Sequence, residues 1–288
     1  MNQSKKILSA SWADPIELTM ISKLKRHAVL CRLRRHLKHA SSGALILPPA
    51  RPGSLGDQAM VRATLSTLRE AGFSRIGILT YDPTDCYTSD PDIAHYQLRD
   101  YLCFGSDEGL FRFIFHAQSH THFFLIGADV MDGYYSMKET LAKIKLARLG
   151  VQCGLKTRVL GFSFNGHAQQ SCIEALRALP PTVAMYARDP VSHRRLFDLL
   201  GRTIEPSADL AFMLPPNDAR PEVRAFLDNM NERKTAGQVL IGLNVASLIL
   251  GRSPTQAQIW TLLEQVQEMI RVTAAQHPDT AFILFPHD

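Results

Sequence analysis

The chain alternates short apolar runs with longer stretches in which apolar residues recur every three or four positions. Runs of the first kind cover residues 44–49, 75–81 and 121–129. Between them, residues 58–72 and 136–150 have the spacing of amphipathic helices. Strands that alternate with helices of this length are typical of βαβ units. The sequence therefore predicts an α/β fold with a Rossmann-like parallel sheet that carries helices on both faces.

The same alternation is interrupted once by a proline-rich stretch and then resumes. Residues 214–222, LPPNDARPE, break the pattern, and we expect a hinge there. This divides the chain into a basic N-terminal helical segment (1–42), a first Rossmann-like lobe (43–215) and a second α/β lobe (216–288). The second lobe contains only two predicted strands. Because so small a sheet buries little apolar surface, we expect this lobe to be incomplete.

Positive charge is concentrated in the N-terminal segment. Residues 1–42 contain nine Lys and Arg and two acidic residues, so subtracting their +7 from the net charge of +5 leaves −2 for the rest. A nucleic-acid partner is therefore not expected. Within residues 22–43, Leu30, Leu33 and Leu37 share one side of a predicted helix, and we favour a solvated helix packed on the protein by these leucines. The alternative is a basic helix that contacts an anionic membrane or an acidic partner.

The cysteines and the N-terminus indicate the compartment. Five cysteines occur without a CxxC pair, at Cys31, Cys86, Cys103, Cys153 and Cys172. We expect reduced thiols, which are typical of cytoplasmic proteins. The first fifteen residues lack the apolar core of a signal peptide, and no apolar run approaches the ~20 residues that span a bilayer. The protein is expected in the cytoplasm, with any membrane contact made by the basic segment.

Small and charged residues follow the first predicted strand. Residues 51–62, RPGSLGDQAMVR, pass from strand to helix and contain Gly53, Gly56 and Asp57. Glycine permits a close backbone approach, and the first amides of a helix can hold an anion. The simpler interpretation is a tight turn with Asp57 as the helix N-cap, and this stretch alone favours it.

Three further polar clusters also follow predicted strands, and they contain Gly127, Asp129, Asp132, Asn165, His167, Arg188 and Ser192. The carboxyl ends of parallel strands meet at one edge of a sheet, where ligands gather. We therefore expect Asp57, Asp129, Asn165 and Arg188 to converge. The planar guanidinium of Arg188 suits a carboxylate or phosphate. Its alternative role is an ion pair with Asp189 or with another carboxylate.

The order and spacing of these clusters resemble the polysaccharide pyruvyl transferase family. The resemblance covers roughly residues 44–288, and its most specific piece is ARDPVSHRRLFDLLG. The chain departs from the family's pattern at Gly53 or Ser54, where asparagine is usual, and at His167, which replaces a proline. The glycine run of the second motif is also altered, to Gly127-Ala128-Asp129. The matching stretches are GSLGDQA (53–59), LIGADVMDG (125–133), LGFSFNGH (160–167), ARDPVSHRRLFDLLG (187–201), SADLAFMLP (207–215) and FPHD (285–288).

Such a resemblance implies a transferase that moves the enolpyruvyl carbons of phosphoenolpyruvate onto hydroxyl groups of a polysaccharide or its lipid-linked precursor. It also implies a two-lobed fold of the GT-B glycosyltransferase type, with phosphoenolpyruvate as the donor and no metal or other cofactor. Matched to this chemistry, Arg188 binds the donor, His287 is the general acid, and Asp57 is the base or orients the acceptor. The substrates would be held by Gly53, Gly56, Gly127, Asp129, Asn165, His167 and Ser192.

Two other functions remain open from the sequence. A GT-B-type glycosyltransferase that uses a nucleotide sugar would share the two lobes. A non-catalytic binding relative would keep the first lobe, and the incomplete second lobe favours it. Other chemistries fit less well, because the chain has no HExxH pattern for a metal and GSLGDQA lacks the lysine of a P-loop. In GFSFNG the second glycine falls one position too late for the nucleophile elbow of hydrolases.

Overall fold

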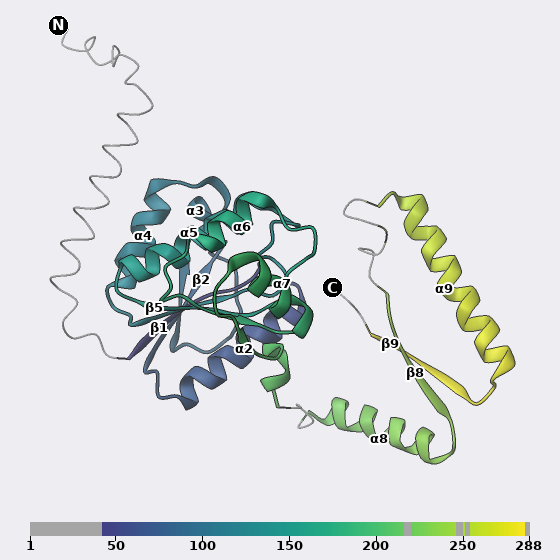
Figure 1. The fold of residues 1–288 in the computed structure, drawn as a ribbon. Helices are drawn as coiled ribbons and strands as arrows, with labels where there is room; N and C mark the ends of the chain where they lie inside the picture. The colour runs from purple at the N-terminus through teal and green to yellow at the C-terminus, as the bar shows by residue number, and fades with distance from the viewer. Residues whose placement is uncertain (1–41, 216–219, 246–249, 251–253, 286–288) are drawn as a thin grey trace, which may run out of the picture. The chain divides into compact units, whose positions relative to one another are not determined.

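A parallel sheet of seven strands forms the centre of the first of two units (Figure 1). The computed structural model describes residues 42–215, 220–245, 250 and 254–285. The first unit comprises Met1–Pro52 and Asp57–Phe212, and the second comprises Gly53–Gly56 and Met213–Asp288. The predicted Rossmann-like parallel sheet is confirmed, with the strand order β3-β2-β1-β4-β5-β6-β7. Its strands are β1 (Gly43–Leu47), β2 (Arg75–Thr80), β3 (Ile93–Gln97), β4 (His122–Ile126), β5 (Lys156–Phe162), β6 (Ala184–Ala187) and β7 (Glu205–Pro206).

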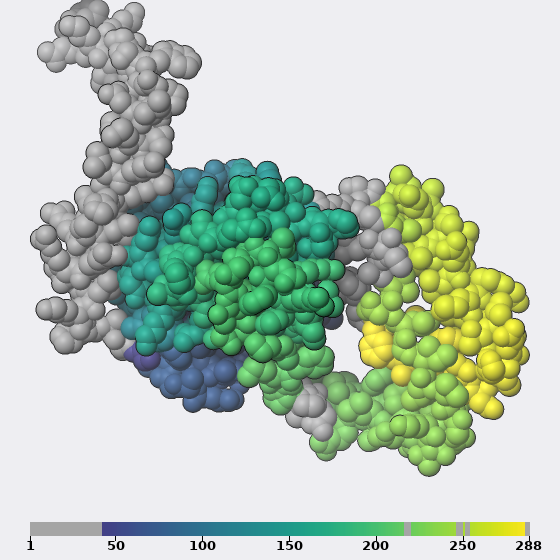
Figure 2. Space-filling view, viewed as in Figure 1, coloured from purple at the N-terminus to yellow at the C-terminus, as the bar shows by residue number. Residues whose placement is uncertain are grey.

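Helices cover both faces of this sheet, as predicted (Figure 1). One face carries α2 (Leu55–Glu70), and the 3-10 helix η2 (Leu210–Met213) packs against the same core. The space-filling view shows the teal and green residues of the first unit packed closely together on the viewed side (Figure 2). The helices of the other face are α3 (Arg99–Phe104), α4 (Asp107–Ala117), α5 (Met137–Gln152), α6 (Gln170–Arg177) and α7 (Pro190–Leu200).

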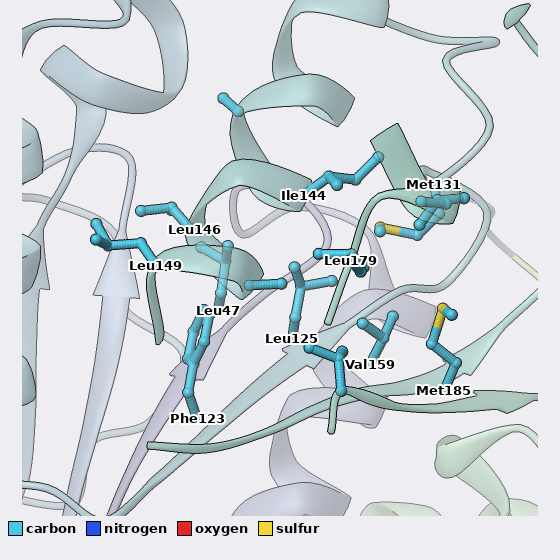
Figure 3. Packing of buried hydrophobic residues seen from close by; sticks show 14 of the residues in the cluster. Leu47, Phe123, Leu125, Met131, Ile144, Leu146, Leu149, Val159, Leu179 and Met185 are labelled. Carbon is cyan, nitrogen blue, oxygen red and sulfur yellow. The ribbon is translucent and has the colours of Figure 1, made fainter. Parts of the chain in front are cut away.

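The central strands are apolar along their whole length because both of their faces are covered. All five residues of β1 are buried. Successive side chains point to opposite faces of a strand, so Leu45 and Leu47 belong to the core under α3–α7, while Ala44 and Ile46 belong to the core under α2. Figure 3 shows Leu47 close to Phe123 and Leu125 beneath the leucines of α5.

Local signals fix where the helices begin and end. The side chain of Asp189 accepts a hydrogen bond of 2.8 Å from the backbone N–H of Ser192, and Pro190 occupies the first turn of α7. The helix ends at Gly201, whose φ of 61° is left-handed and therefore favours glycine. Ser136 caps α5 in the same way as Asp189 caps α7, by accepting from the backbone N–H of Glu139. These caps explain why the polar clusters stand at the ends of strands and the starts of helices.

The region between β2 and β4 contains elements that the sequence pattern did not predict. These elements are β3, α3 and α4. The strand β3 lies at the edge of the sheet, and only the first of its five residues is buried. The short strand β7 at the opposite edge was also missed, and both of its residues are exposed. Edge strands of this kind lack a long apolar run, which is the feature that predicted the central strands.

The second unit contains a parallel pair of strands and two helices. The strands β8 (Val239–Asn244) and β9 (Thr280–Phe285) pair along their whole length. The helices are α8 (Pro221–Thr235) and α9 (Gln256–Gln276), and α9 begins with a capping box made by Thr255 and Gln258. None of the described residues in these four elements is buried. The elements predicted here are thus present, with small differences at their ends.

Two further expectations concern the remaining parts of the chain. The predicted basic N-terminal helix lies outside the described residues. Within the part of the chain that the structure describes, no helix has the length and apolar character needed to cross a membrane. Four of the cysteines are described, and all four are free thiols: Cys86, Cys103, Cys153 and Cys172.

Candidate functional site

The strand order creates a topological switch point between β1 and β4. From β1 the chain builds outward through β2 and β3, and it then returns to pair β4 with the other side of β1. Leu47 pairs with Leu125 at the ends of these two strands, so the loops that follow them leave the sheet from one place. Ligands in open α/β sheets bind at such places. We define the candidate site as the carboxyl edge of β1, β4, β5 and β6, which spans about 14 Å at the usual strand spacing.

The loop after β4 begins with a glycine whose role is structural. A Cβ on Gly127 would collide with the side chain of Phe162, and its N–H donates a hydrogen bond of 2.9 Å to the carbonyl of Leu160. The lack of a side chain at Gly127 makes room for the neighbouring strand, and its expected contact with substrate stays a prediction. The next residue, Ala128, has a φ of 42°, which is strained for a residue with a side chain. Its carbonyl accepts a hydrogen bond of 2.6 Å from the N–H of Ser163, which joins the loops after β4 and β5.

Asp132 makes a second connection between these two loops. It is only 3% exposed, and its two carboxylate oxygens accept from the backbone N–H groups of Tyr134, at 2.8 Å, and Asn165, at 3.0 Å. The side chain of Asn165 in turn accepts from the N–H of His167, at 2.9 Å. Asp132 and Asn165 are therefore used in shaping the loops. His167 is exposed and remains available at the surface.

Arg188, directly after β6, is held by two partners. Its Nε donates to Ser163 Oγ at 2.6 Å, and its Nη1 donates to Asp209 Oδ2 at 2.7 Å. The ion pair considered for this residue exists, and its carboxylate is Asp209 rather than the neighbouring Asp189. Both side chains of the pair are partly exposed, at 22% for Arg188 and 29% for Asp209. Among the described residues Nη2 donates no hydrogen bond, so this end of the guanidinium fork is left to meet a ligand.

Ser192, which was expected to bind substrate, lies in the first turn of α7. Its hydroxyl is buried, donates to Asp189 Oδ2 at 2.7 Å and accepts from the N–H of Phe164 at 2.8 Å. Both functions of the hydroxyl are thus occupied, which favours a role in joining α7 to the loop after β5. Burial alone would raise the pKa of Asp189, but hydrogen bonds from Ser192, Ser163 and the N–H of Val191 hold it below its usual value. Asp189 therefore stays ionised as the cap of α7.

The start of α2 brings the first glycine-rich stretch to the site. The helix begins at Leu55, so Asp57 lies inside its first turn and is not the N-cap that the simpler interpretation assigned to it. An acidic residue in this turn is favoured by the helix dipole. Gly53 has a φ of 148°, which favours glycine, and a Cβ there or on Gly56 would meet no close contact. Among the described residues, no side chain or backbone packs tightly against the Cβ position of either glycine.

Lys143 of α5 is a buried cation that the sequence analysis missed. Its side chain is 2% exposed, and its Nζ donates a hydrogen bond of 2.5 Å to the carbonyl of Pro49, just after β1. The ammonium also lies 5.9 Å from the centre of the Tyr81 ring. Burial lowers the pKa of Lys143 to about 8, although Glu139, Asp57 and Asp129 act in the opposite direction.

Tyr81, beside Lys143, is also buried. Its hydroxyl has no hydrogen-bond partner in the described structure, and burial raises its pKa well above the usual value, so it stays protonated. The loop after β2 is held by Asp85, which accepts from the N–H groups of Tyr81 and Asp82 and forms an ion pair with Arg51 at 3.3 Å. The hydroxyl of Tyr87 donates to the carbonyl of Ala50 at 2.5 Å. The loops after β1 and β2 are thus fixed to each other.

The expected convergence of polar groups can be followed contact by contact. Asp57 and Asp129 both lie near enough to Lys143 to affect its pKa. Asp132 connects the loop of Asp129 to Asn165, and Ser163 connects the same loop to Arg188. Asp57, Asp129, Asn165 and Arg188 therefore belong to one edge of one sheet within the first unit. His287 lies outside the described residues.

The arrangement combines anion-binding and hydroxyl-binding groups. Arg188 and the start of α2 supply donors for an anion, while Asp57 and Asp129 supply acceptors for hydroxyl groups. In the described parts of the chain, no cluster of three or more His, Cys, Asp or Glu has an arrangement that could hold a metal ion. Comparison of the chain with known protein families finds no match, and comparison with curated proteins finds none either. The function is therefore inferred from the site itself.

Proposed function

We propose that the protein is a transferase that moves the enolpyruvyl carbons of phosphoenolpyruvate onto hydroxyl groups of a polysaccharide or its lipid-linked precursor. The observation that carries this proposal is the carboxyl edge of the sheet, where Arg188, Lys143, Asp57 and Asp129 come together. A donor with a phosphate and a carboxylate needs cations, and an acceptor hydroxyl needs a base. Both kinds of group are present on this edge.

Two cations would act on the donor in different ways. Arg188 is partly exposed, and its Nη2 would donate to the carboxylate or phosphate of phosphoenolpyruvate. Lys143 is too deeply buried to touch the donor, so it would act through its electric field and through its bond to Pro49. Asp209 would hold Arg188 in place, because it already binds Nη1.

The chemistry requires one acid and one base. A proton is added to the methylene carbon of phosphoenolpyruvate, a sugar hydroxyl attacks the adjacent carbon, and the bond from that carbon to the phosphate oxygen breaks. A second hydroxyl can close a ketal ring, so that the two hydroxyl protons end on the new methyl group and on the released phosphate. We assign Asp57 as the base and His287 as the acid. The two-lobed GT-B architecture, with the second unit as part of the second lobe, belongs to the same proposal.

A nucleotide-sugar glycosyltransferase is the second candidate. It is favoured by the switch point between β1 and β4 followed by the glycine-rich start of α2, because nucleotide phosphates bind at such junctions. We place pyruvyl transfer first because the order and spacing of the polar clusters resemble the polysaccharide pyruvyl transferase family.

The proposal is tested by the release of phosphate from phosphoenolpyruvate in the presence of candidate saccharides. Calorimetry with phosphoenolpyruvate alone measures donor binding. We expect Arg188→Lys to weaken this binding by at least about tenfold, since lysine keeps the charge but loses the planar fork. Arg177→Gln is the control, because that exposed arginine binds the carbonyl of Leu199 instead. Binding of a nucleotide sugar without binding of phosphoenolpyruvate would replace the proposal with the second candidate.

A further inference from the structure

Two tyrosines on the loop after β4 have no role in the chemistry described above. Tyr134 is 49% exposed and Tyr135 is 43% exposed. Their ring centres lie 5.5 Å apart, with an angle of 87° between the ring planes. Adjacent aromatic rings at a ligand-binding edge expose apolar surface to water, and such exposure is typical of binding sites.

The loop that carries these rings is firmly held. Asp132 fixes the N–H of Tyr134, and the carbonyl of Asp132 accepts from the N–H of Gln169 at 2.8 Å. Gly133 has a φ of 80°, and a Cβ there would lie 2.7 Å from the sulfur of Cys172. The hydroxyl of Thr140 donates to the carbonyl of Val130 at 2.7 Å. The tyrosines are therefore presented by a rigid backbone, which lowers the entropy lost when a ligand binds.

A carboxylate lies beside the rings. The hydroxyl of Tyr135 donates to Asp129 Oδ2 at 2.9 Å. Burial and this hydrogen bond raise the pKa of Tyr135 to about 12, so the phenol keeps its proton at neutral pH and the contact persists. An ionised carboxylate accepts several hydrogen bonds, so Asp129 can bind hydroxyl groups in addition to Tyr135.

We propose that Tyr134, Tyr135 and Asp129 form a carbohydrate-binding subsite. The ring faces stack on the apolar C–H face of a pyranose, and the carboxylate accepts hydrogen bonds from its hydroxyl groups. A neutral sugar fits this chemistry better than a phosphorylated ligand does, because Asp129 and Asp132 repel anions. The inference rests on the proposed function only in treating this sugar as the acceptor.

The test measures sugar binding without phosphoenolpyruvate. Saturation-transfer NMR with methyl β-D-galactopyranoside and methyl β-D-glucopyranoside reports which sugar protons contact the protein. We expect transfer to the C–H protons of one apolar face and a loss of affinity of about threefold to tenfold in Tyr134→Ala and in Tyr135→Ala. Tyr135→Phe keeps the ring and removes the bond to Asp129, so it should bind more tightly than Tyr135→Ala.

The matched control is Phe115→Ala, which removes an exposed aromatic ring from α4. It should bind both glycosides as the parent does, and thermal melts confirm that every variant is folded. The subsite is refuted if the parent binds neither glycoside, if both tyrosine variants keep the parent affinity, or if uridine diphosphate alone binds through these tyrosines. The binding test contains no donor, so it is independent of pyruvyl transfer. If the sugar binds through the tyrosines but no phosphate is released from phosphoenolpyruvate in the activity assay, the subsite stands and the proposed pyruvyl transfer is refuted.

Discussion

The two units bury their apolar residues to very different extents. In the first unit β1 is completely buried, and the cores on both faces of the sheet are continuous. In the second unit no described residue of α8, β8, α9 or β9 is buried, and Trp260 is 59% exposed. The first unit therefore positions its site by packing. The described elements of the second unit depend on local signals, such as the capping box at Thr255.

The largest expected effect comes from removing a core ring of the first unit. Phe123 is fully buried, and the centre of its ring lies 5.2 Å from that of Phe113. Phe123→Ala should therefore lower the free energy of unfolding by about 3–5 kcal/mol. Trp260→Ala in the second unit should change it by less than about 0.5 kcal/mol. Urea unfolding followed by circular dichroism measures both. Similar losses in the two variants would contradict the contrast between the units.

A smaller effect is expected from Gly127→Ala. The added Cβ collides with Phe162, and the tight packing at this position should cost about 3 kcal/mol of stability. Gly56→Ala is the matched control, since its Cβ makes only an ordinary contact of 3.9 Å with Ser54 Oγ at the start of α2. The same unfolding measurement applies. If Gly127→Ala is as stable as the parent, the structural role given to this glycine is wrong.

The buried charge of Lys143 should make stability depend on pH. Its pKa is about 8 in the folded protein against 10.5 in the unfolded chain. Between these values the folded protein has released the proton while the unfolded chain retains it, so stability should rise with pH, by about 3 kcal/mol in total at ~1.4 kcal/mol per pH unit. Below pH 8 both states are charged and this contribution is absent.

The measurement compares urea unfolding from pH 7 to pH 10.5 in Lys143→Met and Lys145→Met. Lys145 lies on the same helix but is exposed, so its variant should keep the rise of the parent. In Lys143→Met the free energy of unfolding should no longer rise with pH over this range, whatever the absolute stability of the variant. An unchanged rise in Lys143→Met would assign the pH dependence to another group.

The smallest effect concerns the second unit. Thr255→Ala removes the cap of α9 and should cost about 1 kcal/mol, seen as faster hydrogen exchange in the first turns of that helix. Thr261→Ala is the control, because its exposed hydroxyl donates to the carbonyl of Ala257 within the same helix. Equal exchange in the two variants would show that the cap does not hold the helix start.

Comparison with the sequence analysis shows which features a pattern can reveal. The central strands were found because burial on both faces makes them apolar throughout. The edge strand β3 was missed because IAHYQ mixes apolar and polar residues and buries only Ile93. Convergence of Asp57, Asp129, Asn165 and Arg188 was predictable from the parallel order of the strands. The partner of Arg188 was not, because Asp209 is brought to it by tertiary structure alone.

Lys143 was missed although a signal for it existed. The buried residues Thr140, Lys143, Ala147 and Gly150 recur at helical spacing along α5, so Lys143 shares their stripe. Lys145, two residues later, is exposed. Residue type alone cannot separate the two lysines, but their positions relative to the apolar stripe can.

The left-handed backbone of Ala128 lowers the stability of the first unit but helps to fix the position of Arg188. Its φ of 42° costs on the order of 1 kcal/mol, yet its carbonyl holds Ser163, which in turn holds Arg188. Glycine at this position would relieve the strain and also let the turn sample other shapes. Selection for thermostability alone would therefore favour glycine at position 128, although glycine would hold Arg188 less firmly. Stability and the positioning of Arg188 are thus opposed at this residue, and both can be measured in one variant.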